Sequence, residues 1–349
     1  MADKDNLIAQ LKTRMQGVDP LTDEPEFHTD SETLARYLKS RDWNVDDAER
    51  LLKETVEYRR QNRPLHLNCR WCHERPGFHS MRQIGHDEMG RPVIYSSFSQ
   101  ASTHRNTVED SVSHVTYLIE NAKLTMQPGI STWVFIIDCT GMTLQSCNPK
   151  LGYGVTQIMA NHYPERLGLV ICLNHSPIFH GVWKAIKVFL HENTVSKMKL
   201  VRSKRKIQQT FQKYFSEEMT AWLHEEIRLN KVKPLPDGQA QFWNPPAEKG
   251  GHDPRGTPSY ISKFIDTYTS NIRDTAKRIH KPHPNVLDHL CGTVLQVTIS
   301  PEEAKEREEA QAVAEASNFD GSDDDTEVHS VHIDDEFKIP QTALPLSTY

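Results

Sequence analysis

The sequence predicts an α/β protein with a largely parallel sheet. Two apolar runs carry this prediction, WVFIID at 133–138 and LGLVICLN at 167–174. A run that is apolar along its whole length is typical of a strand that is covered on both faces. Helical patterns separate these runs from each other and from a third strand, RPVIYSSFSQ at 91–100. Crossovers of that length join parallel strands.

Residues 1–65 are predicted to form a helical segment ahead of the sheet. In TDSETLARYLKSRDW, Leu34, Tyr37 and Leu38 recur at helical spacing. NVDDAERLLKETVEYRR continues the pattern, and Asn44 is its expected N-cap. The two stretches therefore predict consecutive amphipathic helices.

The predicted α/β domain spans residues 66–230. Residues 64–91 are rich in Gly, His and Pro and show no clear periodicity, so no regular element is predicted before Arg91. From there strands and helices alternate, ending with a short strand: 91–100, 106–129, 133–138, 149–162, 167–174, 176–194 and 198–201. Residues 203–230 have a helical pattern with a basic start, SKRK.

Three further segments are predicted from composition. Residues 231–257 are rich in Pro and Gly, which indicates a linker, and 258–299 are predicted to form a helical extension. Residues 300–349 are predicted to be largely disordered, because they are polar and acidic. This tail has fourteen acidic and three basic residues, a net charge of −11. Since the whole chain carries −6, residues 1–299 carry about +5.

The charge and the absence of apolar spans bear on location and partners. A mildly basic body is compatible with reversible contact with an anionic membrane surface. Nucleic-acid-binding proteins carry a denser basic stripe, so no nucleic-acid partner is predicted. The start, MADKDNLIAQ, lacks the apolar core of a signal peptide, and no apolar run approaches the ~18–20 residues that span a bilayer. Six scattered cysteines fit a reducing compartment, so a cytoplasmic, peripherally membrane-associated protein is predicted.

No catalytic centre is predicted. Asp138 ends an apolar strand, where catalytic aspartates often lie, but DCTGM supplies no second carboxylate for phosphoryl transfer. No nucleophile–base pair, Walker A loop or G-x-S-x-G elbow is recognisable. The sequence therefore predicts a protein that is not an enzyme and needs no cofactor.

CRWCH at 69–73 is a cluster with metal-binding chemistry. Its C-x-x-C-H pattern fits c-type haem attachment, which needs an exported chain that nothing in the sequence indicates. A weak zinc pattern is formed by Cys69, Cys72, His73 and His79. Ordinary thiols in a loop are the preferred interpretation, so no metal is predicted, and zinc remains the alternative.

The helix at 178–190 is apolar over most of its circumference. One row and its flanks contain Ile178, Phe179, Val182, Trp183, Ile186, Phe189 and Leu190. A helix of this kind is buried on two sides or touches an apolar ligand. Two interpretations stay open: packing in the core, or lining a lipid cavity and meeting a membrane surface as a gate.

Several stretches resemble one known family. LARYLKSRDWNVDDAERLLKETVEYRR resembles the helical N-terminal segment of CRAL-TRIO lipid-binding proteins. GRPVIY, IIDCTGM, NHYPERLGLVICLN and IKVFLHENTVSK resemble the lipid-binding fold itself, in the right order, over about residues 29–215. YPERLG followed by FL-x-x-x-T-V-S-K is similar to the branch that transfers phosphatidylinositol. The resemblance implies the CRAL-TRIO fold and the binding and transport of phosphatidylinositol, with phosphatidylcholine as a further lipid to consider.

The resemblance also implies a headgroup site. In that branch the inositol phosphate is gripped by residues that correspond to Arg41, Glu165, Thr194 and Lys197. The chemistry suits a phosphodiester, because Arg meets its oxygens with a planar fork and Lys adds a point charge. The helix at 178–190 would then be the lid through which lipid exchanges. The alternative ligand is a sterol, a tocopherol-like molecule or a retinoid, which would leave the four polar residues uncompensated.

Overall fold

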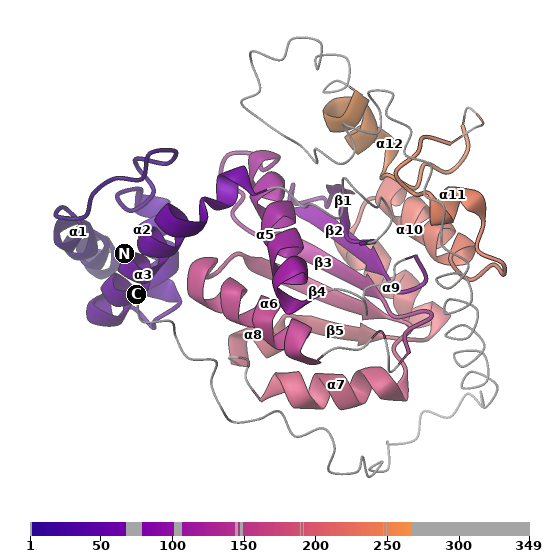
Figure 1. The fold of residues 1–349 in the computed structure, drawn as a ribbon, viewed down its shortest axis with the longest axis horizontal. Coiled ribbons are helices and arrows are strands. Elements are labelled where there is room, and N and C mark those ends of the chain that lie inside the picture. The colour runs from indigo at the N-terminus through magenta and orange to yellow at the C-terminus, as the bar shows by residue number, and fades with distance from the viewer. Residues whose placement is uncertain are drawn as a thin grey trace.

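The computed structural model describes residues 2–67, 79–100, 107–143, 146, 149–188, 190, 192–246, 248 and 250–266. It shows a helical N-terminal bundle beside an α/β body (Figure 1). Several expectations lie outside the described residues: those on Cys69, Cys72, His73, Phe189, the side chains of Val182 and Ile186, and residues 267–349.

The N-terminal bundle has its own apolar core. Its helices are α1 (Ala2–Arg14), α2 (Ser31–Lys39), α3 (Val45–Asn62) and the 3-10 turn η1 (Pro64–His66). The expected N-cap is confirmed, since the Asn44 side chain accepts from the Asp47 N–H at 3.1 Å. The buried side chains of the three α-helices and their connections pack together: Leu11, Met15, Leu21, Leu34, Tyr37, Leu38, Ala48, Leu51, Leu52 and Val56.

The described residues form a five-stranded sheet with the strand order β1-β2-β3-β4-β5. The strands are β1 (Arg82–His86), β2 (Pro92–Ser97), β3 (Trp133–Asp138), β4 (Leu167–Leu173) and β5 (Met198–Val201). β1 is antiparallel to β2, and the other neighbours are parallel, which confirms the predicted fold class. β1 was not predicted, because its buried residues Arg82 and Gln83 are polar and hide the apolar pattern of a strand.

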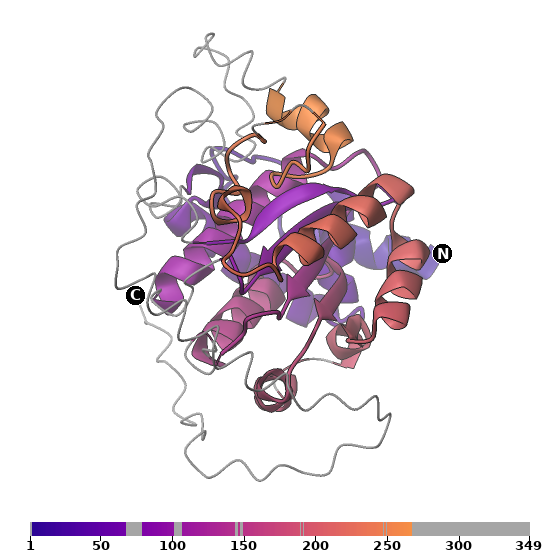
Figure 2. The same cartoon turned by 90° about the vertical axis from the view of Figure 1, so that its right-hand side faces the viewer.

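Helices cover both faces of the sheet. The crossovers are α5 (Val108–Leu124), α6 (Pro149–His162) and α7 (Pro177–Lys187), followed by the short α8 (Glu192–Ser196). Because β2 to β5 succeed one another in one direction and such crossovers are right-handed, these helices lie on the same face. The opposite face carries α9 (Lys204–Tyr214) and α10 (Glu217–Leu229), as the two views show (Figure 1 and Figure 2).

The two faces of the sheet bury separate apolar clusters. We call them the α5–α7 face and the α9–α10 face. Along β3 the residues alternate: Phe135 and Ile137 join the α5–α7 cluster, whereas Val134 and Ile136 join the α9–α10 cluster. The wholly apolar strand is therefore explained by burial on both sides.

The Pro- and Gly-rich segment that composition marked as a linker packs against the body. It contains the short helix α11 (Asp237–Ala240) and leads to α12 (Pro258–Tyr260) and the π-helical turn η3 (Ile261–Asp266). Phe242 and Trp243 are buried in a cluster with Tyr260. The guanidinium of Arg82 lies 4.4 Å from the centre of the Phe242 ring and donates to Glu226 of α10 at 2.8 Å. Scattered aromatic residues thus anchor a segment without helical or strand periodicity.

Candidate functional site

Glu165 occupies a strained turn between α6 and β4. Its backbone has φ +55°, in the left-handed region that favours glycine or asparagine. A glutamate in this conformation costs about 1 kcal/mol relative to the right-handed region. Its side chain is only 13% exposed. A strained backbone that carries a largely buried carboxylate indicates that the contacts of this side chain offset the strain.

Three nitrogen groups surround the Glu165 carboxylate. Lys39 Nζ lies 2.7 Å from Oε2, and Lys197 Nζ lies 4.0 Å from the same oxygen. Asn193 Nδ2 donates to Oε1 at 3.2 Å. The donors come from α2, from α8 and from the residue before β5, so the contact joins three parts of the chain. Two ammonium groups and one carboxylate leave one net positive charge.

Thr194 and Lys197 belong to one turn. The Thr194 carbonyl accepts the backbone N–H of Lys197 at 3.2 Å. The Lys197 carbonyl accepts the N–H of Val170 at 3.0 Å, which ties this turn to β4. The structure therefore brings Glu165 and Lys197 together and places Thr194 in the same turn as Lys197.

Arg41 lies in the turn between α2 and α3. The N–H of Trp43 donates to the Leu38 carbonyl at 2.8 Å and closes α2. Within this turn the half-buried Arg41 donates from Nη1 to the Ser40 carbonyl at 2.9 Å. The contact holds the guanidinium end of the side chain against the backbone at the end of α2.

Lys39 is a site residue that sequence reasoning missed. It precedes Arg41 by two residues, and it is Lys39 that forms the close ion pair with Glu165. A lysine in the last turn of an amphipathic helix gives no specific signal, because most such residues only face solvent. The pairing depends on how the N-terminal bundle docks on the body.

A buried charge network fixes that docking. Glu120 of α5 accepts from Arg59 Nη1 at 2.7 Å, from Lys123 Nζ at 2.8 Å and from the Tyr163 hydroxyl at 2.7 Å. Burial opposes ionisation of Glu120, but Lys123 and Arg59 outweigh it and hold its pKa well below the usual value. Burial, followed by the Glu120 charge, raises the pKa of Tyr163 well above its usual value. The tyrosine of YPER is therefore a structural anchor.

Arg166 turns away from Glu165. Its Nη1 donates to the Ser131 carbonyl at 3.0 Å, which excludes the simple surface ion pair between neighbours that YPER permits. Burial, and then the nearby Arg36 guanidinium, lower the pKa of Arg166 to about 10. Arg166 thus stays charged at neutral pH, and its hydrogen bond to Ser131 holds the loop before β3.

The α5–α7 face leaves many large apolar side chains only half-buried. Those from the sheet and its connections are Met81, Phe98, Met126, Ile137, Leu167, Met198 and Leu200, and those from α6 and α7 are Val155, Ile158, Met159 and Trp183. On the α9–α10 face Tyr214 is the one such residue among those the structure describes. The apolar layer beneath α6 and α7 is therefore incompletely closed by the described side chains.

Helix α7 packs on this layer with part of its surface. Phe179 is buried in the cluster, and Trp183 lies half-buried against it. Ile178 and Leu190 are half-buried, whereas Lys184 and Lys187 are exposed. Val188 is 77% exposed just after the helix. The predicted gate residues that are described therefore lie on and beside the apolar layer, next to an exposed apolar position.

Asp138 has structural partners at the end of β3. Its Oδ1 accepts from the Thr140 hydroxyl at 2.7 Å and from Asn174 Nδ2 at 2.8 Å. Burial raises the pKa of its carboxyl group. These contacts tie the loop after β3 to the end of β4.

The described residues contain neither a membrane-spanning helix nor a metal-binding cluster. None of their helices combines the length and apolar character needed to cross a membrane. Within the same residues no three histidine, cysteine or acidic side chains gather where they could hold a metal ion. His79 stacks on His114 with ring centres 3.9 Å apart.

Two family models match this chain. The model described as CRAL/TRIO domain matches residues 81–221, and the one described as CRAL/TRIO, N-terminal domain matches residues 7–54. Together they cover more than half of the 349 residues. Their boundaries follow the division between the N-terminal bundle and the α/β body.

Three curated proteins are similar to parts of the chain. A CRAL-TRIO domain-containing protein of Schizosaccharomyces pombe is 31% identical over 192 residues, 50% of this chain and 42% of that protein. The SEC14 cytosolic factor of Yarrowia lipolytica is 27% identical over 301 residues, 78% of this chain and 59% of that protein. The phosphatidylinositol/phosphatidylcholine transfer protein SFH11 of Arabidopsis thaliana is 22% identical over 198 residues, 51% of this chain and 52% of that protein. The chain thus spans about half the length of these relatives.

Proposed function

Since the chain belongs to the CRAL/TRIO family of lipid-binding proteins, we propose that it binds phosphatidylinositol and transfers or presents it at membrane surfaces. The observation that carries this proposal is the incompletely closed apolar layer of the α5–α7 face, with a charged cluster at its edge. A lipid has the same two parts, apolar chains and a polar headgroup. The names of two relatives, a SEC14 factor and a phosphatidylinositol/phosphatidylcholine transfer protein, support the choice of ligand class.

The apolar layer suits the acyl chains. Two chains contain on the order of thirty methylenes, each worth roughly 0.8 kcal/mol when it leaves water. A carrier must replace nearly all of that contact to remove the lipid from a bilayer. Half-buried Ile137, Ile158, Met159 and Trp183 would supply apolar contacts, and their own burial would be completed by the ligand.

The charged cluster suits the headgroup. Lys39, Lys197 and Glu165 carry a net charge of +1, which matches the single negative charge of a phosphodiester. In this proposal Lys197 and Thr194 bind the phosphate, and Glu165 accepts hydrogen bonds from inositol hydroxyls. Arg41, two residues beyond Lys39, completes the set from the N-terminal bundle.

Helix α7 is the proposed gate. It connects the apolar layer to the α8 turn that carries Thr194, so a displacement of α7 would open the apolar layer beside the headgroup site. The exposed Val188 at its end would contact the membrane during exchange. No covalent bond changes in this process. A second lipid, phosphatidylcholine, would use the same apolar layer, and the site of action would be the cytoplasmic surface of a membrane.

A transfer assay tests the proposal. Purified protein should carry phosphatidylinositol between liposomes, and Lys197→Ala or Arg41→Ala should reduce the rate at least tenfold with an unchanged circular dichroism spectrum. Lys12→Ala is the matched control, because it removes an exposed lysine of α1 that lies far from the cluster in sequence. Unchanged transfer by both site variants would refute the headgroup assignment.

Mass spectrometry of the lipid that co-purifies with the protein identifies the ligand class directly. We expect phosphatidylinositol, alone or with phosphatidylcholine. A sterol, a tocopherol-like molecule or a retinoid in its place would reject the phosphatidylinositol proposal and leave the family assignment intact.

A further inference from the structure

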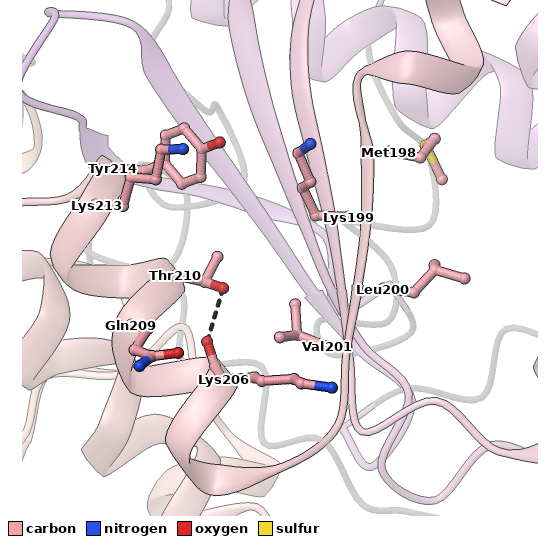
Figure 3. A pocket seen from close by; sticks show the side chains of 9 residues that line it. All are labelled: Met198, Lys199, Leu200, Val201, Lys206, Gln209, Thr210, Lys213 and Tyr214. Atoms are coloured by element: carbon pink, nitrogen blue, oxygen red, sulfur yellow. Dashed lines mark hydrogen bonds between the residues drawn. The ribbon is translucent and has the colours of Figure 1, made fainter. Parts of the chain in front are cut away.

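A basic groove of about 380 Å³ lies between β5 and α9. Its wall on the strand carries Lys199, and its wall on the helix carries Lys206 and Lys213 (Figure 3). Gln209, Thr210 and Tyr214 of α9 add polar groups between the lysines. The groove lies on the α9–α10 side of the sheet, away from the layer proposed to hold lipid.

The positive charge of this groove has no acidic counterpart nearby in the sequence. From Lys197 to Lys213 there are seven basic residues, and no acidic residue occurs between Glu192 and Glu217. Within the described part of the chain, Lys199 has no carboxylate partner. Residues 1–299 as a whole carry only about +5, so this one stretch exceeds the net charge of the entire body.

The groove also borders an open sheet edge. β5 is the last strand of the sheet and pairs only with β4 among the described strands. Figure 3 shows Lys199 and Val201 on the side of β5 that faces α9, with Met198 and Leu200 on the other side. An open sheet edge can accept an extended peptide as an additional strand. Lysines beside the edge discourage pairing with an apolar peptide and favour an acidic one.

We propose that the groove binds an acidic, extended peptide, and that its occupant is the acidic tail of the same chain, centred on residues 323–327. The tail carries a net charge of −11, the largest acidic excess in the sequence, against the +7 of the stretch from Lys197 to Lys213. The chain thus contains both a basic groove and a segment of complementary charge.

The spacing of charges agrees with this assignment. In an extended segment Asp323, Asp325 and Glu327 fall on one side, because side chains alternate along a strand. The first and last of them are then about 13 Å apart. Lys206 and Lys213 are seven residues apart on α9, about 10 Å along the helix axis. The reach of lysine side chains covers the difference.

The connecting chain is long enough. The body ends at Asp266 in the described structure, and 56 residues lie between it and Asp323. As a random coil, a segment of that length would have a root-mean-square span of about 40 Å. Tethering of this kind gives an effective concentration in the millimolar range, so a weak electrostatic contact suffices. The contact weakens as salt increases, because all its charges are near the surface.

Lysine reactivity in the full-length chain tests the proposal. The protein is acetylated briefly at low concentration, and the modification of each lysine is read by peptide mass spectrometry. The variant D323N/D325N/E327Q should increase the reactivity of Lys199, Lys206 and Lys213 at least threefold. The matched control E302Q/E303Q/E306Q removes the same charge from the same tail and should leave them unchanged. Lys12 reports on general reactivity and should not respond.

Four outcomes would overturn the assignment. Equal reactivity in all three proteins means that the tail does not occupy the groove. An equal effect of both tail variants means that the tail screens the surface without docking. Protection that disappears on dilution means that a second copy supplies the tail. If the tail variants have no effect but anionic vesicles protect the same lysines, the groove belongs to a membrane contact.

Discussion

The two faces of the sheet are built from similar strands and differ in how completely they are covered. On the α9–α10 face, Phe211, Leu223 and Ile136 have no exposed surface. On the α5–α7 face, Ile137, Ile158 and Met198 stay half-buried against the core. A contiguous group of partly exposed apolar side chains is typical of a surface that a ligand or a membrane covers. The comparison teaches that the closed face supplies stability and the incompletely closed one supplies the proposed lipid site.

A neighbouring pair of residues tests this comparison most strongly. Ile136 and Ile137 are adjacent on β3 and point to opposite faces. Ile136→Ala should lower the free energy of unfolding by about 3 kcal/mol, because it leaves a cavity in a closed core. Ile137→Ala should cost about 1 kcal/mol. Urea denaturation checks both, and equal losses would show that the two faces are packed alike.

Acid should loosen the α5–α7 face at the start of α7. Burial, and then His180 and Arg202, lower the pKa of His175, just before α7, to about 4. Because the ordinary value is about 6.5, the opened state takes up the proton first as the pH falls. The stabilising contribution of neutral His175 is thus complete above pH 6.5 and is lost toward pH 4.

Hydrogen exchange measures this loss. Between pH 7 and pH 5 the protection of α7 amides should fall by up to about 1 kcal/mol after correction for intrinsic rates, because solvent screens a half-buried imidazole and reduces the full linkage value, and His175→Gln should remove most of the change. The amides of the central strand β3, which contains no histidine, serve as the reference. A parallel loss of protection in β3 would mean that acid acts on the whole fold.

A larger side chain at Ile137 should reduce lipid binding, whereas one at Ile136 should reduce stability. Ile137→Phe should fill space that the lipid would occupy, reduce co-purified lipid about tenfold, and leave the melting temperature nearly unchanged. Ile136→Phe should instead destabilise the protein by about 1–3 kcal/mol, because the closed core has no room for it. Full lipid loading of a stable Ile137→Phe protein would place the ligand elsewhere.

Lys39→Ala should have the smallest effect on stability. Lys39 is 61% exposed, and an exposed ion pair of this kind contributes about 0.2–1 kcal/mol. We expect a loss in that range, together with a several-fold lower transfer rate, because Glu165 loses its closest partner. Lys53→Ala, which removes a solvent-facing ion pair of α3, is the control and should leave transfer unchanged. Equal transfer by the two variants would remove Lys39 from the site.

Much of the fold was predictable because it rests on local patterns. The apolar runs at 133–138 and 167–174 became β3 and β4 within a residue, since a strand covered on both faces must be apolar throughout. β1 escaped prediction because Arg82 is buried by a carboxylate from α10 and an aromatic ring near residue 242, both distant in sequence. The Pro-rich segment has no periodic pattern, because single aromatic residues such as Phe242 and Trp243 anchor it to the body.

The candidate site was predictable only in part. Glu165 and Lys197 were identified by resemblance, and the structure places them 4.0 Å apart. Lys39 was missed because its partner lies 126 positions away and only docking of the N-terminal bundle brings them together. The roles of Arg41 and Thr194 stay predictions, and the transfer assay tests the first of them.

The sequence by itself determined the alternation of strands and helices from β2 to β5, the apolar character of both faces of β3 and β4, and the separation of basic body from acidic tail, because each depends on residues close together in the chain. Only the tertiary structure decided which face is closed, which lysine meets Glu165 and where the basic groove runs. These depend on the packing of helices against the sheet, which joins residues whose separation in sequence carries no pattern.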